Sequence, residues 1–329
     1  MSRDPIWIRE AEVVELLSLA EAIDALERGL RLEAEGSARN MAKTQALWDG
    51  GHTLHAIGAV VPGGRLVGTK TWAHTGGGAT PLLVLWDSES GRLRAVIEAF
   101  ALGQMRTGAM TGVATKWMAA EEADTLAIIG TGKQALTQVA AVHAVRPLKR
   151  LTVYSPRAES RAAFADKARA ALNVAVEDSA ALAEATEGAA IVTLVTRARE
   201  AFLDAGHLAP GAHLNAVGAI SPEREEFRQG VFARAGAVAV DSLDSVKRLS
   251  REFIEYYGQG PGDWAEARPI SALIANGFAR EAGTDVTLFK AMGMGISDLA
   301  LGAVIVERAE AAGVGRAFSH PEKAAPRLT

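Results

Sequence analysis

The chain has 329 residues, 49% of them hydrophobic and 22% charged, with a formal net charge of -4. This balance is ordinary for a folded globular protein and excludes the basic surplus of nucleic-acid-binding proteins. The absence of cysteine excludes disulfides, thiol nucleophiles and thiolate metal sites. Charged residues interrupt the first 25 positions, and no long apolar run follows. We therefore expect a cytoplasmic protein without a signal peptide, a membrane span or a nucleic-acid partner.

The first third of the chain predicts a helix, an antiparallel sheet and a second helix. Residues 11–35 carry apolar positions at helical spacing, which predicts one amphipathic helix. Between Gln45 and Ile97 the pattern alternates, with Gly-rich turns and a hairpin turn before Arg92. The expected strands are 53–61, 66–72 and 81–87, and a helix over 101–119 follows.

From Thr125 onward, short apolar strands alternate with helical segments. The expected strands are 125–130, 151–154, 190–196, 213–218 and 237–241, with helices over 135–144 and from Glu159. Such alternation is typical of a parallel sheet covered on both faces, so the expected fold class is α/β. A last amphipathic helix is expected over 296–312, and the chain from Arg316 onward reads as a loose tail.

The turn after the first of these strands has the pattern GxGxxA, formed by Gly130, Gly132 and Ala135. In a Rossmann unit the first glycine allows a tight turn, and the second lets the backbone approach a pyrophosphate. The small third residue lets the helix pack on the strand, and the helix N-terminus faces the phosphates. The position between a strand and a helix favours this interpretation. A glycine turn of another doubly wound domain, such as a methyltransferase, is the alternative.

The end of the second strand distinguishes the two nicotinamide cofactors. An acid there binds the ribose 2′-hydroxyl of NAD, whereas here Ser155 holds the position and Arg157 follows. A hydroxyl and a guanidinium suit a 2′-phosphate, which favours NADP. The alternative is that Arg157 only begins a solvated helix face.

Two basic residues fall on apolar faces outside this unit. Arg106 shares a helix face with Val113 and Trp117. A guanidinium in that position needs an anion, which is either a structural carboxylate or a substrate carboxylate or cofactor phosphate. Lys70 shares a strand face with Trp72, and by itself this position fits snorkelling as well as function.

Three other basic residues carry less signal. Arg39, just before the predicted sheet, by itself reads as a surface residue. His52 and His55 lie three residues apart on a strand and point to opposite faces, so they do not form a metal pair. We expect no metal site.

Taken together, the motifs of this chain resemble the ornithine cyclodeaminase/mu-crystallin family. The matching segments occur in the order of the family and cover nearly the whole chain. They are Ser37–Arg39, Gly68–Lys70, Met105–Ala119, Ile128–Ala135, His213–Ala219 and Thr287–Asp298. Together these segments are specific, although none would suffice alone.

The resemblance implies a homodimer with two domains in each chain. Residues 1–120 and 295–329 would form an α+β domain for substrate binding and dimerisation. Residues 121–294 would form a Rossmann doubly wound parallel sheet inserted into it. The resemblance also implies that Arg39, Lys70 and Arg106 gather around the carboxylate of an amino or imino acid. The cofactor residues it implies are Gly130, Gly132, Lys133, Gln134, Ala135, Ser155, Arg157, Thr196, Val217 and Met292.

One segment departs from the pattern of the family's cyclodeaminases, which carry an aspartate two residues before the proline of a GxDxPGK-like segment. Here that segment is Gly218-Ala219-Ile220-Ser221-Pro222-Glu223, so Ile220 stands where the acid is expected. This departure puts the cyclodeaminase reaction in doubt. The family's imine reductases and mu-crystallin-like members also lack the acid, and the chain resembles them more closely.

We therefore expect an NAD(P)H-dependent reductase of small cyclic or acyclic α-imino acids, with NADP favoured and NAD as the alternative. Hydride transfer is the chemistry of the cofactor, and the three cations would orient the substrate. The proton on the imine nitrogen would come from solvent or from Lys70. Two other functions stay open. One is an NAD-dependent amino-acid cyclodeaminase, and the other is a mu-crystallin-like protein that binds a small ligand with its cofactor.

Overall fold

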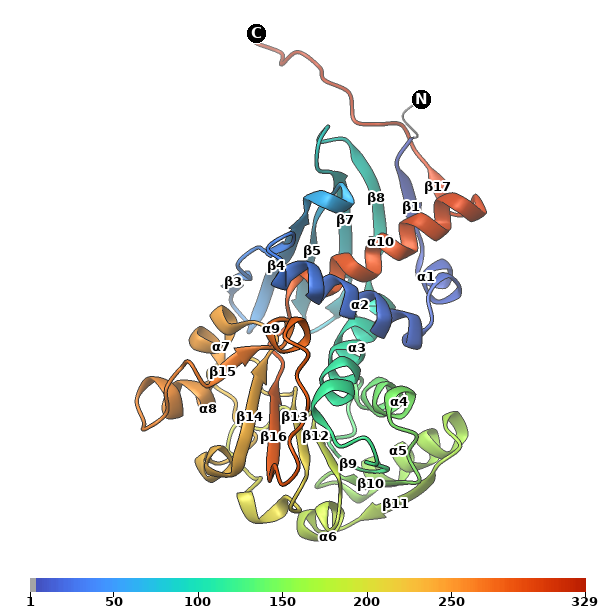
Figure 1. Ribbon diagram of the computed structural model, residues 1–329. Helices are drawn as coiled ribbons and strands as arrows, with labels where there is room; N and C mark the ends of the chain where they lie inside the picture. The colour runs from blue at the N-terminus through green and yellow to red at the C-terminus, as the bar shows by residue number, and fades with distance from the viewer. Residues whose placement is uncertain (1–3) are drawn as a thin grey trace.

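The computed structural model describes residues 4–329 and contains two sheets (Figure 1). The strands of the first sheet are β1 (Ile6–Ile8), β2 (Arg39–Asn40), β3 (Thr44–Trp48), β4 (His52–Val61), β5 (Leu66–Thr75), β6 (Gly78–Ala79), β7 (Leu82–Asp87), β8 (Leu93–Glu98) and β17 (Arg316–Ala317). Those of the second sheet are β9 (Thr125–Ile129), β10 (Arg150–Tyr154), β11 (Ala175–Ser179), β12 (Ile191–Leu194), β13 (His213–Ala216), β14 (Ala235–Val240), β15 (Ala267–Pro269) and β16 (Val286–Lys290).

Helices pack against both sheets. The α-helices are α1 (Glu10–Leu16), α2 (Leu19–Ala34), α3 (Phe100–Met118), α4 (Ala135–Val145), α5 (Ala158–Ala171), α6 (Leu182–Thr186), α7 (Leu243–Leu249), α8 (Arg251–Phe253), α9 (Ile270–Ala275) and α10 (Gly295–Ala312). Short helical turns are η1 (Pro62–Gly64), η2 (Ala205–His207), η3 (Gln229–Arg234) and η4 (Ile254–Gly258). Within residues 4–329, every helix falls short of the length and apolarity that crossing a bilayer requires.

The second sheet is parallel throughout, in the order β11-β10-β9-β12-β13-β16-β14-β15. Its first five strands follow the winding of nucleotide-binding doubly wound folds, so the winding reverses between β9 and β12. Alternate residues of β9 enter the cores of the two faces. Leu126 and Ile128 pack with α4 and α5, and Ala127 and Ile129 pack on the opposite face. The expected α/β class is confirmed.

The first sheet runs in the order β17-β1-β8-β7-β5-β4-β2, with β3 on β4 and β6 on β5. The hairpins from β3 to β8 are antiparallel, as expected. One face packs on α2, α3 and α10, and Figure 1 shows α2 and α10 crossing it. The other face carries Val60, Val67 and Val84, whose side chains stay half-buried in the single chain.

One expectation for the ends of the chain is wrong, and one differs in detail. The helix expected over 11–35 is two helices, because Leu17 is extended and Ser18 begins α2. The Ser18 hydroxyl accepts the N–H of Glu21, and the Glu21 carboxylate accepts the N–H of Ser18. The apolar spacing continues across this break and hides it. The expected loose tail differs only at its start, where Ala317 of β17 pairs with Ile6, and residues 318–329 lie outside any helix or strand.

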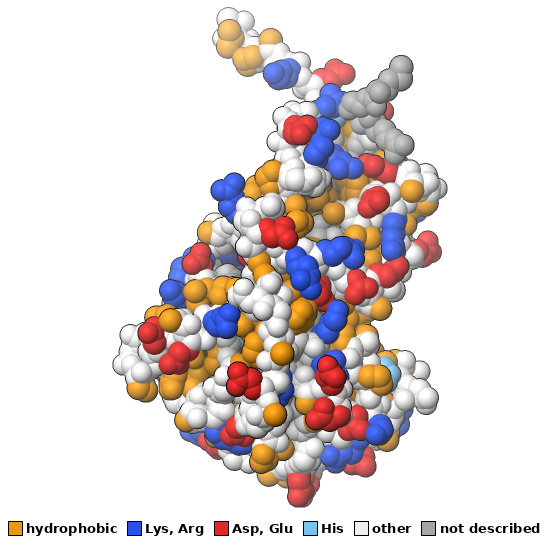
Figure 2. All heavy atoms as spheres, in the orientation of Figure 1, with side chains coloured by type: hydrophobic (Ala, Val, Ile, Leu, Met, Phe, Trp, Pro, Cys, Tyr) orange, Lys and Arg blue, Asp and Glu red, His pale blue; other side chains and the backbone are white. Residues whose placement is uncertain are grey.

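Charge is mixed over the molecular surface. Figure 2 shows acidic and basic side chains interspersed on the face it presents, with no continuous basic area there. This distribution agrees with the small net charge of -4.

Candidate active site

The turn between β9 and α4 has the backbone that the GxGxxA pattern requires. Gly130 has φ +113°, and a Cβ built there would lie 2.7 Å from the carbonyl oxygen of Val195. Any side chain at this position would clash and be strained. A Cβ at Gly132 would meet open space, whereas Ala135 is fully buried where α4 begins. The amino end of α4 therefore faces open space, which suits a phosphate.

This turn forms one wall of a pocket of about 600 Å³ at the carboxyl edge of the parallel sheet. Dinucleotides bind at this edge in doubly wound folds, where the winding reverses. Four residues expected to bind the cofactor line the pocket, namely Gly130, Gly132, Ser155 and Thr196. The remaining wall comes from the ends of β9 and β10, from Leu182 and from the segment after β12, namely Ile129, Thr131, Tyr154, Pro156, Leu182, Val195, Arg197, Ala198, Arg199, Glu200 and Phe202.

The other residues expected at the cofactor lie around this pocket rather than in its lining. Lys133 and Gln134 continue the glycine turn, with Lys133 exposed and Gln134 half-buried. Arg157 is exposed and holds the N-cap position of α5. Val217 and Met292 are buried just beyond β13 and β16.

A buried carboxylate holds two cations at the first sheet. Lys70 Nζ lies 2.5 Å from Asp298 Oδ1, and Arg106 Nε lies 3.4 Å from the same oxygen. The side chains are 4%, 18% and 0% exposed for Lys70, Arg106 and Asp298. Asp298 is thus the structural carboxylate that the sequence left open as a partner for Arg106. One carboxylate between two cations leaves a net positive charge, and an anion would stabilise it.

Glycines let the backbone close around this cluster. A Cβ at Gly295 would lie 1.8 Å from the carbonyl oxygen of Gly58, so α10 begins directly against β4. Gly293 has φ +86°, and its Cβ would lie 2.9 Å from Arg106 Nη1. The loop after β16 and the first turn of α10 therefore reach the cations only because they carry no side chains here.

The surroundings of Lys70 change its pKa. Burial, and then the nearby charge of Arg106, lower the pKa of Lys70 to about 8, against the opposing effect of Asp298. Its Nζ lies 5.4 Å from the ring centroid of Trp72, and His55 stacks on Trp72 at 4.7 Å between centroids. Burial, and then the charge of Lys43, lower the pKa of His55. Trp72 thus lies beside the lysine, and His55 stacks on Trp72.

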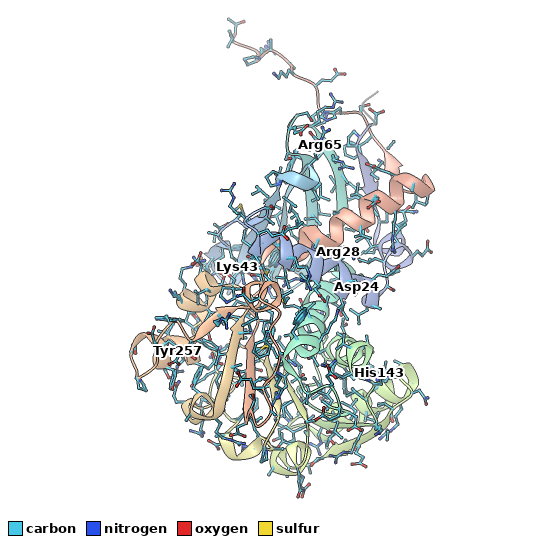
Figure 3. All side chains as sticks on the ribbon, in the orientation of Figure 1. Asp24, Arg28, Lys43, Arg65, His143 and Tyr257 are labelled. Atoms are coloured by element: carbon cyan, nitrogen blue, oxygen red, sulfur yellow. The ribbon has the colours of Figure 1, made fainter. Side chains whose placement is uncertain are left out.

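A third cation of the site, Lys43, was not singled out from the sequence. Burial, and then the charge of Arg106, lower the pKa of Lys43, whereas Asp241 raises it. Lys43 in turn contributes to the lowered pKa of Lys70. Figure 3 shows Lys43 where β3 meets the segment that carries α7. Among residues 4–329, Lys43 forms no ion pair, so its ammonium is free to bind an anion.

The structure does not bring Arg39 to this cluster, contrary to the position that the family resemblance implied. Arg39 pairs with Val60, and the next residue, Asn40, pairs with Ala59. Ala59 lies opposite Gly68, on the face that carries Lys70. Because neighbouring residues of a strand point to opposite faces, Asn40 shares the face of Lys70 and Arg39 does not. Arg39 is exposed on the other face.

Asp241 connects the cluster to the parallel sheet. It follows β14 and is buried, and its carboxylate accepts the N–H groups of Met292 at 2.9 Å and Gly293 at 2.6 Å. Burial raises the pKa of Asp241, while these N–H groups and then the charge of Arg106 lower it. Asp241 thereby fixes the loop after β16 beside Arg106.

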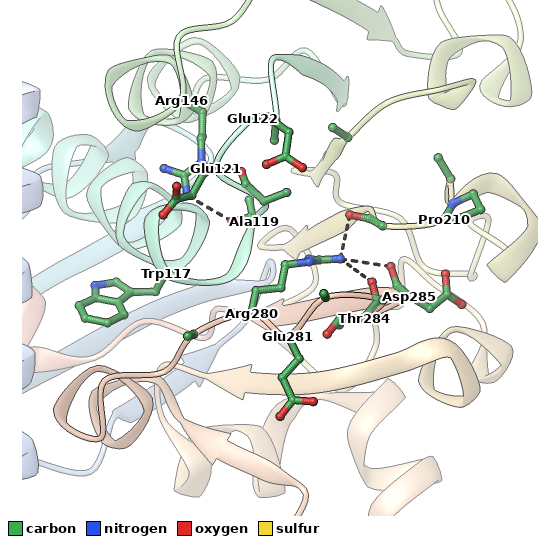
Figure 4. A pocket seen from close by; sticks show the side chains of 18 of the residues that line it. Trp117, Ala119, Glu121, Glu122, Arg146, Pro210, Arg280, Glu281, Thr284 and Asp285 are labelled. Carbon is green, nitrogen blue, oxygen red and sulfur yellow. Dashed lines mark hydrogen bonds between the residues drawn. The ribbon is translucent and has the colours of Figure 1, made fainter.

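A larger cavity, of about 1100 Å³, lies at the amino ends of the parallel strands (Figure 4). Its arginines bind the backbone at the end of α3. Arg280 Nη1 donates to the carbonyl oxygen of Met118 at 3.0 Å, and Arg146 Nε donates to that of Ala120 at 2.8 Å. Cations suit the carboxyl end of a helix, so these arginines are structural.

The fold and the pocket define a Rossmann-type protein, and comparison with known proteins specifies its family. The chain belongs to the ornithine cyclodeaminase/mu-crystallin family, whose profile matches residues 4–313. A Delta(1)-pyrroline-2-carboxylate reductase of Bacillus cereus is 32% identical over 274 residues, which are 80% of each chain. The resemblance drawn from the sequence motifs is therefore confirmed.

Solved structures of related proteins have the same fold. A Delta(1)-pyrroline-2-carboxylate reductase of Thermococcus litoralis, in complex with NADH and L-proline, has a TM-score of 0.89 at 26% identity. The similarity covers 95% of this chain and 100% of that one. An archaeal alanine dehydrogenase dimer with bound NAD has a TM-score of 0.88 at 25% identity, over 96% and 99% of the two chains.

Proposed function

We propose that this protein is an oxidoreductase that reduces small cyclic or acyclic α-imino acids with NAD(P)H. The observation that carries the proposal is the pairing of Lys70 and Arg106 with the buried carboxylate of Asp298, with the charge of Lys43 acting on both cations. The cluster retains positive charge, and Asp241 and its loop connect it to the parallel sheet that carries the cofactor pocket. The reductases among the similar proteins support the same reaction.

The three cations have different parts in holding a substrate carboxylate. Asp298 keeps Lys70 and the Nε side of Arg106 in place, and the Nη groups of Arg106 stay available to a carboxylate. Lys43 approaches from the connection between β2 and β3 and supplies the charge that Asp298 does not neutralise. Lys70, with its pKa lowered to about 8, is also the side chain suited to donate the proton to the imine nitrogen.

The residues around the glycine turn fit a nicotinamide dinucleotide. The amino end of α4 at Gly132 would receive the pyrophosphate, and Thr196 would contact the cofactor from the opposite wall. When bound, the nicotinamide supplies the hydride. Ser155 and Arg157 favour NADP, whereas the similar structures contain NADH or NAD. We also assign to the cofactor Gly130, Lys133, Gln134, Ala135, Val217 and Met292.

Ile220 favours reduction over cyclodeamination. Its side chain is 38% exposed, two residues after Gly218 at the carboxyl edge of the sheet. An apolar wall disfavours the second ammonium group of a diamino acid, and it provides no carboxylate to carry that group's proton. A simple imino acid carries no such second charge.

The protein is also proposed to be a homodimer. The free face of the first sheet carries the apolar residues Val60, Val67 and Val84, which are half-buried in one chain, and a second copy would cover them. In this arrangement residues 1–120 and 295–329 form the substrate and dimerisation domain, and residues 121–294 form the dinucleotide domain. Light scattering should give about twice 34.5 kDa. A monomer at micromolar concentration would contradict the dimer.

Loss of NAD(P)H absorbance with a panel of cyclic imino acids and of keto acid plus amine mixtures tests the reaction. We expect turnover with at least one imino acid and no ammonia release from ornithine or lysine. Ammonia release without net cofactor change would identify a cyclodeaminase. Binding of an imino acid and cofactor without turnover would identify a ligand-binding protein.

A further inference from the structure

A buried carboxylate that the proposed reaction does not use lies beneath the cofactor pocket. Glu226 has no exposed surface. Its Oε1 accepts the backbone N–H and the side-chain O–H of Thr196, both at 2.7 Å. Its Oε2 accepts the N–H groups of Gly218 at 2.8 Å and Ala219 at 3.0 Å. One carboxylate thus joins the loops that follow β12 and β13.

The two loops fit closely around this carboxylate. A Cβ at Gly218 would lie 2.2 Å from the carbonyl oxygen of Thr196 and 2.3 Å from Glu226 Oε1. Gly218 is therefore required for this contact and not for a turn, because its φ is not positive. Thr196 lines the cofactor pocket, and Ile220 directly follows Ala219. Glu226 thus sets the distance between the loop that lines the cofactor pocket and the loop that carries Ile220.

Two other buried charged residues, Glu252 and Lys290, lie beside Glu226. Its backbone N–H donates to Glu252 Oε1 at 3.1 Å, and Lys290 Nζ lies 3.5 Å from the same oxygen. The charge of Lys290 also acts on the Glu226 carboxylate. Burying two carboxylates and a lysine is costly, and such clusters are weak evidence for stability. We therefore attribute to this cluster a role in fixing the geometry of the two loops rather than in stabilising the fold.

We propose that Glu226 is a positioning residue for hydride transfer. By holding Thr196 and Gly218–Ala219 together, it keeps the nicotinamide end of the cofactor pocket in register with the cations that bind the substrate. The part of this inference that concerns hydride transfer rests on the proposed function. The part that concerns cofactor affinity does not, since cofactor binding is measured without substrate.

Glu226→Gln tests this role with almost no change in volume. An amide presents one acceptor and one NH₂ donor, so donors would face donors at one of the two loops. We expect kcat to fall about tenfold or more and the Kd of NAD(P)H to rise by a similar factor. The deuterium isotope effect with cofactor labelled at C4 should increase. The KM of the imino acid should stay within about threefold, because the cations lie on other elements.

Two further variants separate positioning from simple burial of charge. Glu252→Gln removes a buried charge of the same cluster, keeps a side-chain oxygen for the N–H of Glu226 and leaves the bonds to Thr196, Gly218 and Ala219 in place. Its kcat and cofactor Kd should therefore change by less than about threefold. Glu226→Asp keeps the charge beside Lys290 but is too short to bond to both loops, so its kcat should stay low. Equal effects of Glu226→Gln and Glu252→Gln, or full activity of Glu226→Asp, would overturn the proposal. A wild-type protein without imine turnover would refute the function alone, because the cofactor titrations of these variants still test Glu226.

Discussion

The cofactor pocket and the cation cluster would bind anions in different ways. The pocket offers the backbone of one short segment, where Gly130 and Gly132 leave the amino end of α4 uncovered. The cluster uses the side chains of Lys43, Lys70 and Arg106, which come from separate elements, and Asp298 of α10 holds the last two. A site built from backbone groups requires that side chains be absent. A site built from side chains requires that residues from distant parts of the chain come together. The second kind is therefore more sensitive to the loss of one group.

Arg106→Ala should have the largest effect and test this contrast most directly. Removing the guanidinium deprives the substrate of its bidentate partner, and kcat/KM should fall by at least about a hundredfold. The Kd of NAD(P)H, measured by fluorescence, should change little because the cofactor pocket does not contain Arg106. Loss of folding or of cofactor binding would instead mean that Arg106 serves chiefly as the structural partner of Asp298.

Lys43→Ala, with Arg39→Ala as the matched control, tests which cation completes the cluster. Lys43 acts on Arg106 and Lys70, whereas Arg39 lies on the opposite face of the sheet. We expect the KM of the imino acid to rise about tenfold or more in Lys43→Ala. Arg39→Ala should stay close to wild type in the same assay. The reverse result would restore the assignment that the family resemblance implied for Arg39.

The pH dependence of kcat/KM should report Lys70. Its pKa is lowered to about 8, so the free enzyme loses this positive charge as the pH rises through that value. Only the protonated form attracts the carboxylate and donates a proton, so kcat/KM should fall up to about tenfold per pH unit above it. A guanidinium keeps its charge, so Lys70→Arg, if active, should remove this fall. A flat wild-type profile between pH 7 and about 9 would contradict the role of Lys70.

Arg157→Ala tests a side chain beside the cofactor pocket that we propose to select the cofactor. If Arg157 binds a 2′-phosphate, the Kd of NADPH should rise about tenfold. The Kd of NADH should remain nearly unchanged, and this cofactor is the internal control. Equal affinity of the unaltered protein for NADH and NADPH would show that Ser155 and Arg157 do not select the cofactor.

Glu33→Gln should have the smallest effect, on stability. Burial raises the pKa of Glu33 to about 7 from its usual 4.5, so between these values the folded state binds more protons than the unfolded state. Stability therefore falls as the pH rises through this window. The amide of the variant cannot ionise and still accepts the bond from Asn40, so the variant should melt a few degrees higher than wild type at pH 8. Equal pH dependence of the two melting curves would contradict this.

The contrast between a site formed by one short segment and a site formed by distant segments also explains which site residues could be predicted from the sequence. The glycine turn lies within Gly130–Ala135, so neighbouring residues alone indicate its role. Asp298 also left a local signal, as a single acid within an apolar stretch, but its partners lie far away in the sequence. Lys43 left none, because its position depends on an irregular connection between β2 and β3. Arg39 was misplaced because strand register, which decides the face, is not visible without the partner strand.

Strands, too, could be predicted only where their own residues carry a clear pattern. The apolar strands β9, β12 and β13 were predicted because they are buried on both faces. The edge strand β11 was not, since Val176 is its only buried residue and Glu177 and Asp178 dominate its pattern. Edge strands lack the apolar pattern of central strands, and only pairing with β10 defines this one.

Two arginines, Arg146 and Arg280, bind the backbone at the carboxyl end of α3, the helix that carries Arg106. Arg146 and Arg280 fasten its last turn to the parallel sheet, and Arg106 lies twelve residues earlier than Met118 on the same rod. Twelve residues of α-helix span about 18 Å. A tilt of about 5° about this end would displace the guanidinium by about 1.5 Å, enough to break a hydrogen bond. The packing of α3 on α2, α4 and α10 opposes such a tilt, so the position of Arg106 also depends on residues far from the cation cluster.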